Sequence, residues 1–238
     1  MTPYYDHAGI VIYCGDCREI LPHLPKVDCV ITDPPYGIGS TSHRPLSRWY
    51  GYDISGNNDT SMRDFLIAWN MGPMLMFDSA RHDAPEGTRC TLIWDKGGSV
   101  GFNGDNTLPW KSTYEPIRVV GSPFIGGRIH ESVLHYPASG FSRPMHPHEK
   151  PVDLLLHLVA CTQGTILDPF MGSGTTLVAA KNLGRKAIGI EICREYCDIA
   201  IRRLEQEVLP FGEGNQFQER QGDSQLRLVQ EVFNFDAA

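Results

Sequence analysis

Two consecutive prolines constrain the fold of this chain more than any other feature. They follow residues 27–32, a short and mostly apolar run with β-branched side chains that is typical of a buried strand. The sequence continues as Asp33, Pro34, Pro35 and Tyr36. The strand must end here, because neither proline can donate to a sheet ladder and each fixes its own φ. This predicts a carboxylate, a rigid carbonyl-bearing turn and an aromatic ring at the C-terminal edge of a sheet, where open α/β sheets bind ligands.

A second turn, later in the chain, contains two closely spaced glycines. Residues 165–167 are typical of a short strand, Gly172 and Gly174 of a tight turn, and residues 175–183 of a helix. The third glycine of a dinucleotide fingerprint and the lysine of a P-loop are both missing, so a phosphate cradle is not expected. Glu191 ends the next expected strand and can accept hydrogen bonds from a ribose diol. A Gly-x-Gly turn alone would be an ordinary tight turn, but with this acid it predicts an adenosyl-binding site.

The remaining pattern alternates between strands and helices. Further strands are expected at 9–13, 90–94, 114–120, 130–136 and 186–190. Further helices are expected at 16–24, 60–70, 150–161 and 193–208. Such alternation predicts an α/β chain with a largely parallel sheet.

Composition narrows the class of protein without deciding its partners. A chain of 238 residues suits one large domain. Seven cysteines without a regular framework indicate a reducing, cytoplasmic setting. Neither a signal peptide nor a membrane-spanning apolar run is recognised, so we expect no membrane partner. The net charge of −7 argues mildly against nucleic-acid binding, yet residues 118–150 carry more basic than acidic side chains, and the question stays open.

Four motifs stand in a fixed order along the chain: Thr32-Asp-Pro-Pro-Tyr-Gly37, His146-Pro-x-x-Lys-Pro151, Asp168-Pro-Phe-Met-Gly-Ser-Gly-Thr-Thr176 and Gly189-Ile-Glu191. Together they resemble the S-adenosylmethionine-dependent DNA amino-methyltransferases that act on adenine N6 or cytosine N4. The catalytic motif precedes the cofactor motif, which is similar to the β-type permutation of that family. The resemblance covers residues 9–37 and 144–208 firmly and the middle of the chain only loosely.

The resemblance implies a Rossmann-like class I methyltransferase fold, with a mixed, mostly parallel seven-stranded sheet and helices on both faces. The methyltransferase domain would span residues 1–210, with loop insertions at 38–60 and 97–112 and a short target-recognition segment at about 121–147. Residues 211–238 would form an acidic, partly disordered tail.

The resemblance also assigns a cofactor, S-adenosylmethionine, to particular residues. Asp16 would lie near the adenine amine and Glu191 would hold the ribose, whereas the individual role of Lys150 stays open. The full set of implied cofactor residues is Asp16, Asp33, Lys150, Asp168, Pro169, Phe170, Gly172, Ser173, Gly174, Thr175 and Glu191.

The chemistry of an exocyclic amine explains the catalytic motif from its residues. The lone pair of such an amine is delocalised into the base, which makes it a poor nucleophile. The Asp33 carboxylate and the Pro34 carbonyl could each accept one N–H and draw the nitrogen toward a tetrahedral geometry. A flipped base costs a few kcal/mol, and stacking on Tyr36 could offset part of that. We therefore expect Asp33, Pro34, Pro35 and Tyr36 to form the catalytic site.

DNA contacts are expected from basic and aromatic loop residues. For any single one of them, an ordinary solvated side chain is an equally good interpretation. The expected contacts are Arg44, Arg48, Trp49, Arg128 and Arg143, with Arg118 as a further one.

No metal site is expected. The pairs Cys14/Cys17 and Cys193/Cys197 invite a zinc interpretation, but their spacings are imperfect and a metal there would crowd the adenosine pocket. Reduced cysteines packing as small apolar groups are the better account. The histidines at 130, 135, 146 and 148 show no metal spacing.

The predicted function is methyl transfer from S-adenosylmethionine to adenine N6 in double-stranded DNA. Asp rather than Ser at position 33 favours adenine over cytosine N4, which stays as the first alternative. An RNA base or protein glutamine as substrate, and an inactive DNA-binding module, are the remaining ones. The sequence leaves open whether the protein is a monomer or a homodimer and whether a restriction endonuclease is its partner.

Overall fold

A single mixed sheet organises the computed structural model, which describes residues 1–36, 60–69, 72–97, 107, 109–126, 130–138 and 149–206. Its strands are β1 (Tyr5–His7), β2 (Ile10–Cys14), β3 (Cys29–Thr32), β4 (Met74–Phe77), β5 (Thr88–Asp95), β6 (Tyr114–Val120), β7 (Val133–His135), β8 (Ile166–Asp168) and β9 (Ala187–Glu191). The helices are α1 (Cys17–Ile20), the 3-10 helix η1 (Leu21–His23), α2 (Ser61–Trp69), α3 (Val152–Ala160), α4 (Thr175–Asn182) and α5 (Arg194–Glu205). Every strand and helix that the sequence predicted within the described residues is present: β6 has the predicted ends, the predicted helix at 16–24 divides into α1 and η1, and the other ends differ by a few residues.

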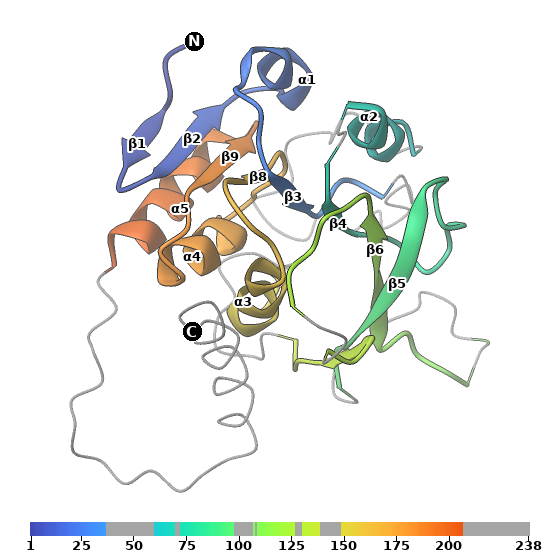
Figure 1. The fold of residues 1–238 in the computed structure, drawn as a ribbon. Coiled ribbons are helices and arrows are strands. Elements are labelled where there is room, and N and C mark those ends of the chain that lie inside the picture. The colour runs from blue at the N-terminus through green and yellow to red at the C-terminus, as the bar shows by residue number, and fades with distance from the viewer. Residues whose placement is uncertain are drawn as a thin grey trace, which may run out of the picture.

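The strands lie in the order β1-β2-β9-β8-β3-β4-β6-β5-β7 (Figure 1). The strands from β2 to β4 in this order are all parallel, whereas β6 runs antiparallel to both of its neighbours. This confirms a mixed, mostly parallel α/β fold. The expected number of seven strands is wrong, since the described residues form nine. The two that the sequence did not predict are β1, which runs antiparallel to β2, and β4, which runs parallel to β3.

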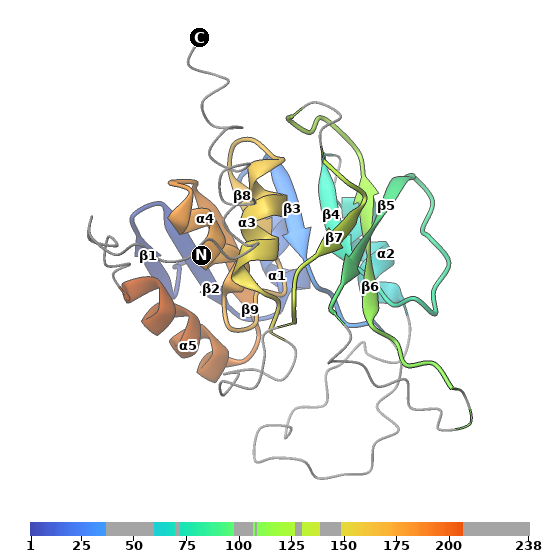
Figure 2. The same cartoon turned by 90° about the horizontal axis from the view of Figure 1, so that it is seen from below.

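Helices cover both faces of the sheet. One core cluster joins apolar residues of α3, α4 and α5 to one face, and a second joins those of α1 and α2 to the other. Figure 2 shows α3, α4 and α5 on the near side of the sheet, with α1 and α2 behind it. The central strands β3 and β4 are therefore buried at every position. Continuous burial on both faces is typical of parallel strands in such folds.

Strand β4 is an element that the sequence analysis missed. Its residues, Met-Leu-Met-Phe, show no apolar–polar alternation, and the preceding helical pattern was expected to run to about residue 70 or beyond. A short continuous apolar run cannot be assigned by periodicity alone. Only pairing with β3 and β6 identifies it as a strand.

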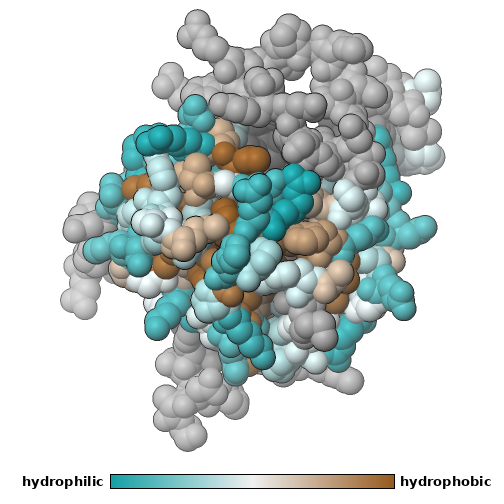
Figure 3. Space-filling view, turned by 90° about the horizontal axis from the view of Figure 1, so that it is seen from above, coloured by the Kyte–Doolittle hydropathy of each residue, from teal (hydrophilic) through white to brown (hydrophobic). Residues whose placement is uncertain are grey.

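The face drawn in Figure 3 intersperses hydrophilic side chains with smaller apolar areas. Within the described ranges, none of the helices has the length and apolar character needed to cross a membrane. The expected tail at 211–238 and almost all of the insertion at 38–60 lie outside the described residues. So do residues 98–106 and 108 of the second insertion, and residues 127–129 and 139–147 of the expected target-recognition segment. The proposed division into domain, insertions and tail stays a prediction.

Candidate active site

Four acidic residues stand at the C-terminal ends of four adjacent strands. Asp16 follows β2, Glu191 ends β9, Asp168 ends β8 and Asp33 follows β3. These strands are neighbours and all parallel, so their carboxyl ends meet at one edge of the sheet. From β8 the chain continues to β9 on one side, and from β3 to β4 on the other. The seam between β8 and β3 is therefore the topological switch point, where open α/β sheets bind ligands.

The glycine turn is hydrogen-bonded to Glu191. Asp168 ends β8, residues 169–174 form the turn, and Thr175 begins α4. The Gly172 N–H donates to Glu191 Oε2 at 3.0 Å, and the Cys193 N–H donates to Oε1 at 2.8 Å. Burial raises the pKa of the Glu191 carboxyl, against the effect of these hydrogen bonds. Each carboxylate oxygen keeps lone pairs for a further donor.

Gly172 leaves space at this turn for a ligand. Its φ is +52°, a conformation that L side chains rarely adopt, and among the described residues no neighbouring atom lies within 4 Å of the position that a Cβ would occupy. A ligand can therefore approach the backbone beside the Glu191 carboxylate. This combination of open backbone and diol-binding acid fits the adenosyl moiety of a nucleoside cofactor.

Asp168 joins the two halves of the site. Its Oδ1 accepts hydrogen bonds from Thr32 Oγ1 at 2.9 Å and from the Phe170 N–H at 3.1 Å, which connects β8 to β3. Burial raises the pKa of Asp168 to about 6, while the hydrogen bonds from Thr176 and Thr32 act in the opposite direction. The aspartate thus sits between the glycine turn and the strand that carries Asp33.

Asp16 lies at the outer end of this row. Its side chain caps α1 by accepting from the Arg18 N–H at 2.9 Å, as the sequence predicted. The hydrogen bonds from the Arg18 guanidinium hold the pKa of Asp16 below its usual value. A hollow of about 310 Å³ opens beside Asp16 and Gly15, lined also by the N-terminal residues 1–4. Asp16 is therefore ionised and borders an accessible space.

The Asp33 carboxylate is held from both sides. Its Oδ2 lies 2.9 Å from Lys150 Nζ, and its Oδ1 accepts a hydrogen bond from the Tyr36 hydroxyl. Lys150 Nζ also lies 2.8 Å from Glu115 Oε2, and Lys96 Nζ lies 2.6 Å from Glu115 Oε1. Lys150 was assigned to the cofactor by the resemblance, but its ammonium contacts the catalytic motif. No sequence pattern indicated Glu115 or Lys96, which come from the region between the recognised motifs.

Opposite charges set the protonation states of this cluster. Burial acts to lower the pKa of Lys150, but Asp33 and Glu115 outweigh it and the pKa is raised. Burial acts to raise the pKa of Glu115, but Lys150 and Lys96 outweigh it and the pKa is lowered. Burial and the neighbouring carboxylates Asp33 and Glu115 raise the pKa of Tyr36 well above its ordinary value. At neutral pH, Lys150 is charged and Tyr36 is a hydroxyl donor.

Aromatic rings surround the Lys150 ammonium. The nitrogen lies 4.7 Å from the ring centroid of Phe77, 5.6 Å from that of Trp94 and 5.9 Å from that of Tyr36. Such cation–π contacts favour the charged amine in a desolvated position. They also fix the ammonium laterally, so that its hydrogen bonds to Asp33 and Glu115 keep one geometry.

Arg203 of α5 is a site residue that the sequence analysis missed. Its Nη1 donates to the Ser173 carbonyl and hydroxyl oxygens, both at 2.9 Å, and to Thr175 Oγ1 at 3.1 Å. Its Nη2 lies 2.7 Å from Glu149 Oε1. Because Glu149 directly precedes Lys150, one guanidinium connects the glycine turn to the segment that positions Lys150. An arginine within an amphipathic helix gives no sequence signal for such a role.

The expected DNA contacts cannot be placed in the same way. Arg44, Arg48, Trp49, Arg128 and Arg143 all lie outside the described residues.

Arg118 is described, and its expected exposure to DNA is wrong. It is buried, with Nε 2.9 Å from Asp78 Oδ2 and Nη2 2.9 Å from the His82 carbonyl oxygen. Its positive charge is paired inside the fold and does not reach the surface, because β6 lies between two other strands.

Fold and site together define a class I methyltransferase with an amine-directed catalytic motif. The family of N6/N4 DNA methylases matches residues 78–202 of this chain. A relative from Escherichia coli (strain K12), named "Putative methylase YubD", is 30% identical to this chain. The alignment covers 80% of this chain and 88% of that protein. The chain belongs to the N6/N4 DNA methylase family, which confirms the resemblance seen in the sequence.

Solved structures agree with this assignment. The structure of the M1.HpyAVI-SAM complex is 25% identical and has a TM-score of 0.60. The superposition covers 83% of this chain and 100% of that one. The cytosine-N4-specific PvuII DNA methyltransferase is 15% identical with a TM-score of 0.62, covering 98% of this chain and 95% of that one. At that identity the second likeness concerns the fold alone.

Proposed function

We propose that this DNA methyltransferase transfers a methyl group to the N6 amine of adenine in double-stranded DNA. Its cofactor is S-adenosylmethionine. The observation that carries the proposal is the Asp33 carboxylate, which is held at the switch point by Lys150 and Tyr36, next to the glycine turn. A carboxylate fixed beside a rigid Pro34 carbonyl suits an amine with two N–H donors.

The row of strand-end acids and the glycine turn would hold the cofactor. Glu191 would accept from the ribose hydroxyls, Asp16 from the adenine amine, and the turn at residues 168–175 would surround the methionyl part. When bound, the cofactor supplies an electrophilic methyl carbon on a sulfonium. The fit is supported by the open backbone at Gly172 and by the lone pairs left on Glu191.

The catalytic motif would act on the amine of a flipped base. Asp33 would accept one N–H and the Pro34 carbonyl the other, which directs the nitrogen lone pair out of the plane of the base. Lys150 and Tyr36 would keep the carboxylate in place, since each already bonds one of its oxygens. Positioning of this kind can supply most of the acceleration when the electrophile is built into the cofactor. Stacking on the Tyr36 ring would be worth about 1–3 kcal/mol.

Adenine is favoured over cytosine by Asp at position 33, where a Ser would favour cytosine N4 within the family. Cytosine N4 is the alternative that keeps the same mechanism, and the fold neighbour from the PvuII system is named as cytosine-N4-specific. Arg44, Arg48, Trp49, Arg128 and Arg143 would contact the DNA, by phosphate and base contacts suited to their side chains. A monomer or a homodimer, with or without a restriction endonuclease as partner, is compatible with this proposal.

The proposal is tested by expressing the protein in a methylation-deficient bacterium and sequencing the genomic DNA with a method that detects modified bases. We expect N6-methyladenine within one short motif, lost in Asp33→Asn and retained in Asp6→Ala, which alters an exposed aspartate. N4-methylcytosine in its place would overturn the target base but keep the mechanism. Unmodified DNA, together with intact binding of S-adenosylmethionine, would overturn DNA as the substrate.

A further inference from the structure

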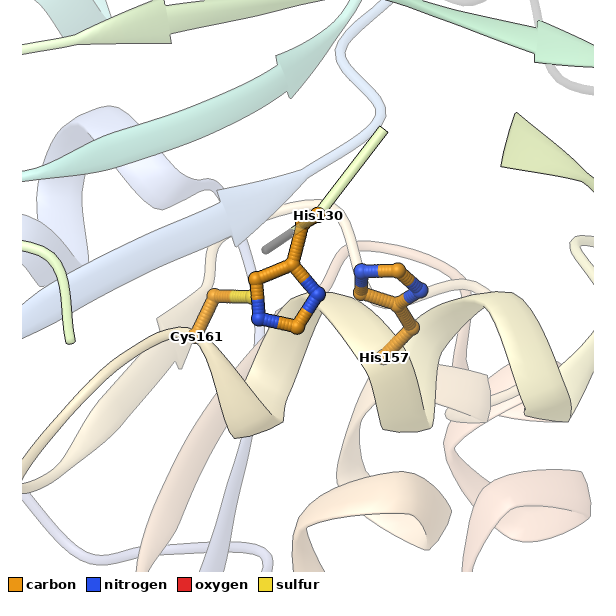
Figure 4. A group of neighbouring side chains, drawn as sticks. All are labelled: His130, His157 and Cys161. Atoms are coloured by element: carbon orange, nitrogen blue, oxygen red, sulfur yellow. The ribbon is translucent and has the colours of Figure 1, made fainter. Parts of the chain in front are cut away.

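Three side chains with metal-binding atoms meet beside α3, on residues that the proposed reaction does not use. His157 lies on α3, and Cys161 caps its C-terminus one turn later. His130 comes from the segment that leads into β7. One ligand atom from each of these residues lies within 4.8 Å of those of the other two (Figure 4). Among the described residues, these are the three histidine, cysteine or acidic side chains whose ligand atoms lie close enough to hold one ion.

The two histidine rings are arranged to share a ligand. Their centroids are 4.8 Å apart, at an interplanar angle of 51°. Figure 4 shows one nitrogen of the His157 ring turned toward His130. The other nitrogen, Nδ1, lies 2.8 Å from the Tyr136 hydroxyl. Metal-binding histidines nearly always have their second nitrogen hydrogen-bonded in this way, because the bond fixes the tautomer and the ring orientation.

The environment of the His130 ring indicates a ligand. Its Nε2 is buried and has no hydrogen-bond partner within the described ranges. A Cβ at Gly126 would come within 3.2 Å of this nitrogen, so the chain packs closely against it. A buried polar atom without a partner is destabilising, and such atoms are rare in native proteins. A bound ion would satisfy this ring.

The protonation states suit metal binding. Burial and the neighbouring His130 lower the pKa of His157 to about 4, and burial also lowers the pKa of His130. Both rings are neutral at pH 7, so a metal would not compete with protons for their lone pairs. Burial raises the pKa of the Cys161 thiol to about 11, but a thiol that coordinates a metal is deprotonated and releases its proton to the solvent.

We propose that His130, His157 and Cys161 bind one Zn²⁺ ion, with a water molecule as the fourth ligand. Two imidazoles and one thiolate form a donor set that tetrahedral zinc accepts. Zinc–nitrogen and zinc–sulfur bonds of about 2.0–2.3 Å place tetrahedral ligand atoms roughly 3.5 Å apart. The ligand atoms, which lie within 4.8 Å of one another, would therefore move closer by up to about 1.3 Å on binding. The ion would fasten the segment before β7 to α3.

One cysteine from each of the two pairs considered for zinc in the sequence provides an alternative zinc site. Cys14 and Cys197 are neighbours, the Cys197 thiol donates to the Glu191 carbonyl oxygen at 3.7 Å, and burial is the main reason for the raised pKa of Cys197. A zinc ion held there would be lost in Cys14→Ser/Cys197→Ser, whereas an ion at the proposed site would be lost in Cys161→Ser. The two variants thus distinguish the sites.

The first experiment measures zinc by plasma mass spectrometry in the full-length protein, purified without a metal-affinity tag and dialysed against zinc. We expect about one zinc per chain for the wild type and for Cys14→Ser/Cys197→Ser. We expect at least a tenfold lower content for Cys161→Ser and for His130→Gln. Wild-type protein without zinc, or full zinc content in Cys161→Ser, would overturn the proposal.

The second experiment keeps the proposal testable if a variant folds poorly. In wild-type protein loaded with Co²⁺, we expect a thiolate-to-cobalt charge-transfer band and the visible bands of tetrahedral cobalt. EDTA should lower the melting temperature of the zinc-loaded wild type and leave that of Cys161→Ser unchanged. A cobalt spectrum without the thiolate band would show that Cys161 is not a ligand, and a melting temperature insensitive to EDTA would show that no structural ion is held.

Discussion

The ammonium of Lys150 lies 2.9 Å from Oδ2 of Asp33, and this contact joins the segment before the cofactor turn to the catalytic motif. Aromatic rings enclose the Lys150 ammonium, which also forms an ion pair with Glu115. The Asp33 carboxylate therefore has a cation held in a fixed position as its partner. In the proposed reaction, methyl transfer would depend on where this carboxylate points. We therefore propose Lys150 as a positioning residue for catalysis.

Lys150→Met should lower kcat by about 100-fold, because the aliphatic stem is retained but Asp33 loses its partner. Leaving Asp33 and Glu115 without their shared cation should also lower the free energy of unfolding by about 3 kcal/mol. Single-turnover methylation and urea unfolding measure the two effects. Lys26→Met, which alters an exposed lysine, is the control. Unchanged kcat in Lys150→Met would show that Tyr36 alone positions the carboxylate.

Arg203→Met should weaken cofactor binding more than it slows methyl transfer. The substitution removes three hydrogen bonds to Ser173 and Thr175 and leaves the Glu149 carboxylate, which is largely buried, without this guanidinium. We expect KM for S-adenosylmethionine to rise about tenfold and stability to fall by about 3 kcal/mol. Arg202→Met on the same helix alters an exposed arginine and should change neither. Equal effects of both variants would argue against a specific clamp.

Gly172→Ala and Gly184→Ala form a matched pair for the cofactor turn. Both glycines have positive φ, +52° and +63°, and at neither does the described part of the chain place an atom within 4 Å of an added Cβ. Each substitution should therefore destabilise the fold by a similar amount, about 1–2 kcal/mol. Only Gly172→Ala places its methyl group where the cofactor is expected, so calorimetry should show about tenfold weaker binding for this variant alone. Equal affinities would place the cofactor elsewhere.

Asp168→Asn should change how stability depends on pH. The folded-state pKa of Asp168 is raised to about 6 from 3.8, so the folded protein binds the proton more tightly than the unfolded chain. Its contribution is present below the unfolded pKa and is lost as pH rises through the folded one. Relative to Asp168→Asn, the wild type should therefore lose about 2–3 kcal/mol between about pH 4 and pH 7. Urea unfolding at several pH values measures this, and parallel curves would contradict it.

The sequence predicted those parts of the site that follow from local patterns. The strand ends at Asp33 and Asp168 were predicted to within one residue because prolines follow both aspartates, and the end at Glu191 was predicted because the apolar run of 186–190 stops there. Strand β4 was missed because a run of four apolar residues fits a helix and a strand equally well. Arg118 was misjudged because its ion pair with Asp78 depends on the antiparallel pairing of β6 with β4, which no local pattern reveals.

The long-range contacts of the site could not be predicted for the same reason. Lys150 reaches Asp33, and Arg203 reaches Ser173 and Glu149, only because helices and strands from distant parts of the chain pack together. The cluster of His130, His157 and Cys161 shows this most clearly. His157 and Cys161 were not considered, and the histidines that were considered had no metal spacing along the sequence.

The pairing of β3 with β8 has a consequence for how such chains can vary. Thr32 and Asp168 are 136 residues apart in sequence but share a hydrogen bond across neighbouring strands. The sheet itself, and not the connecting polypeptide, sets the spacing between the catalytic and cofactor halves of the site. Loops in between can therefore lengthen or shorten without moving Asp33 relative to the glycine turn. By the same logic, evolution can exchange the order of the two halves along a gene, because either order produces the same neighbouring strands.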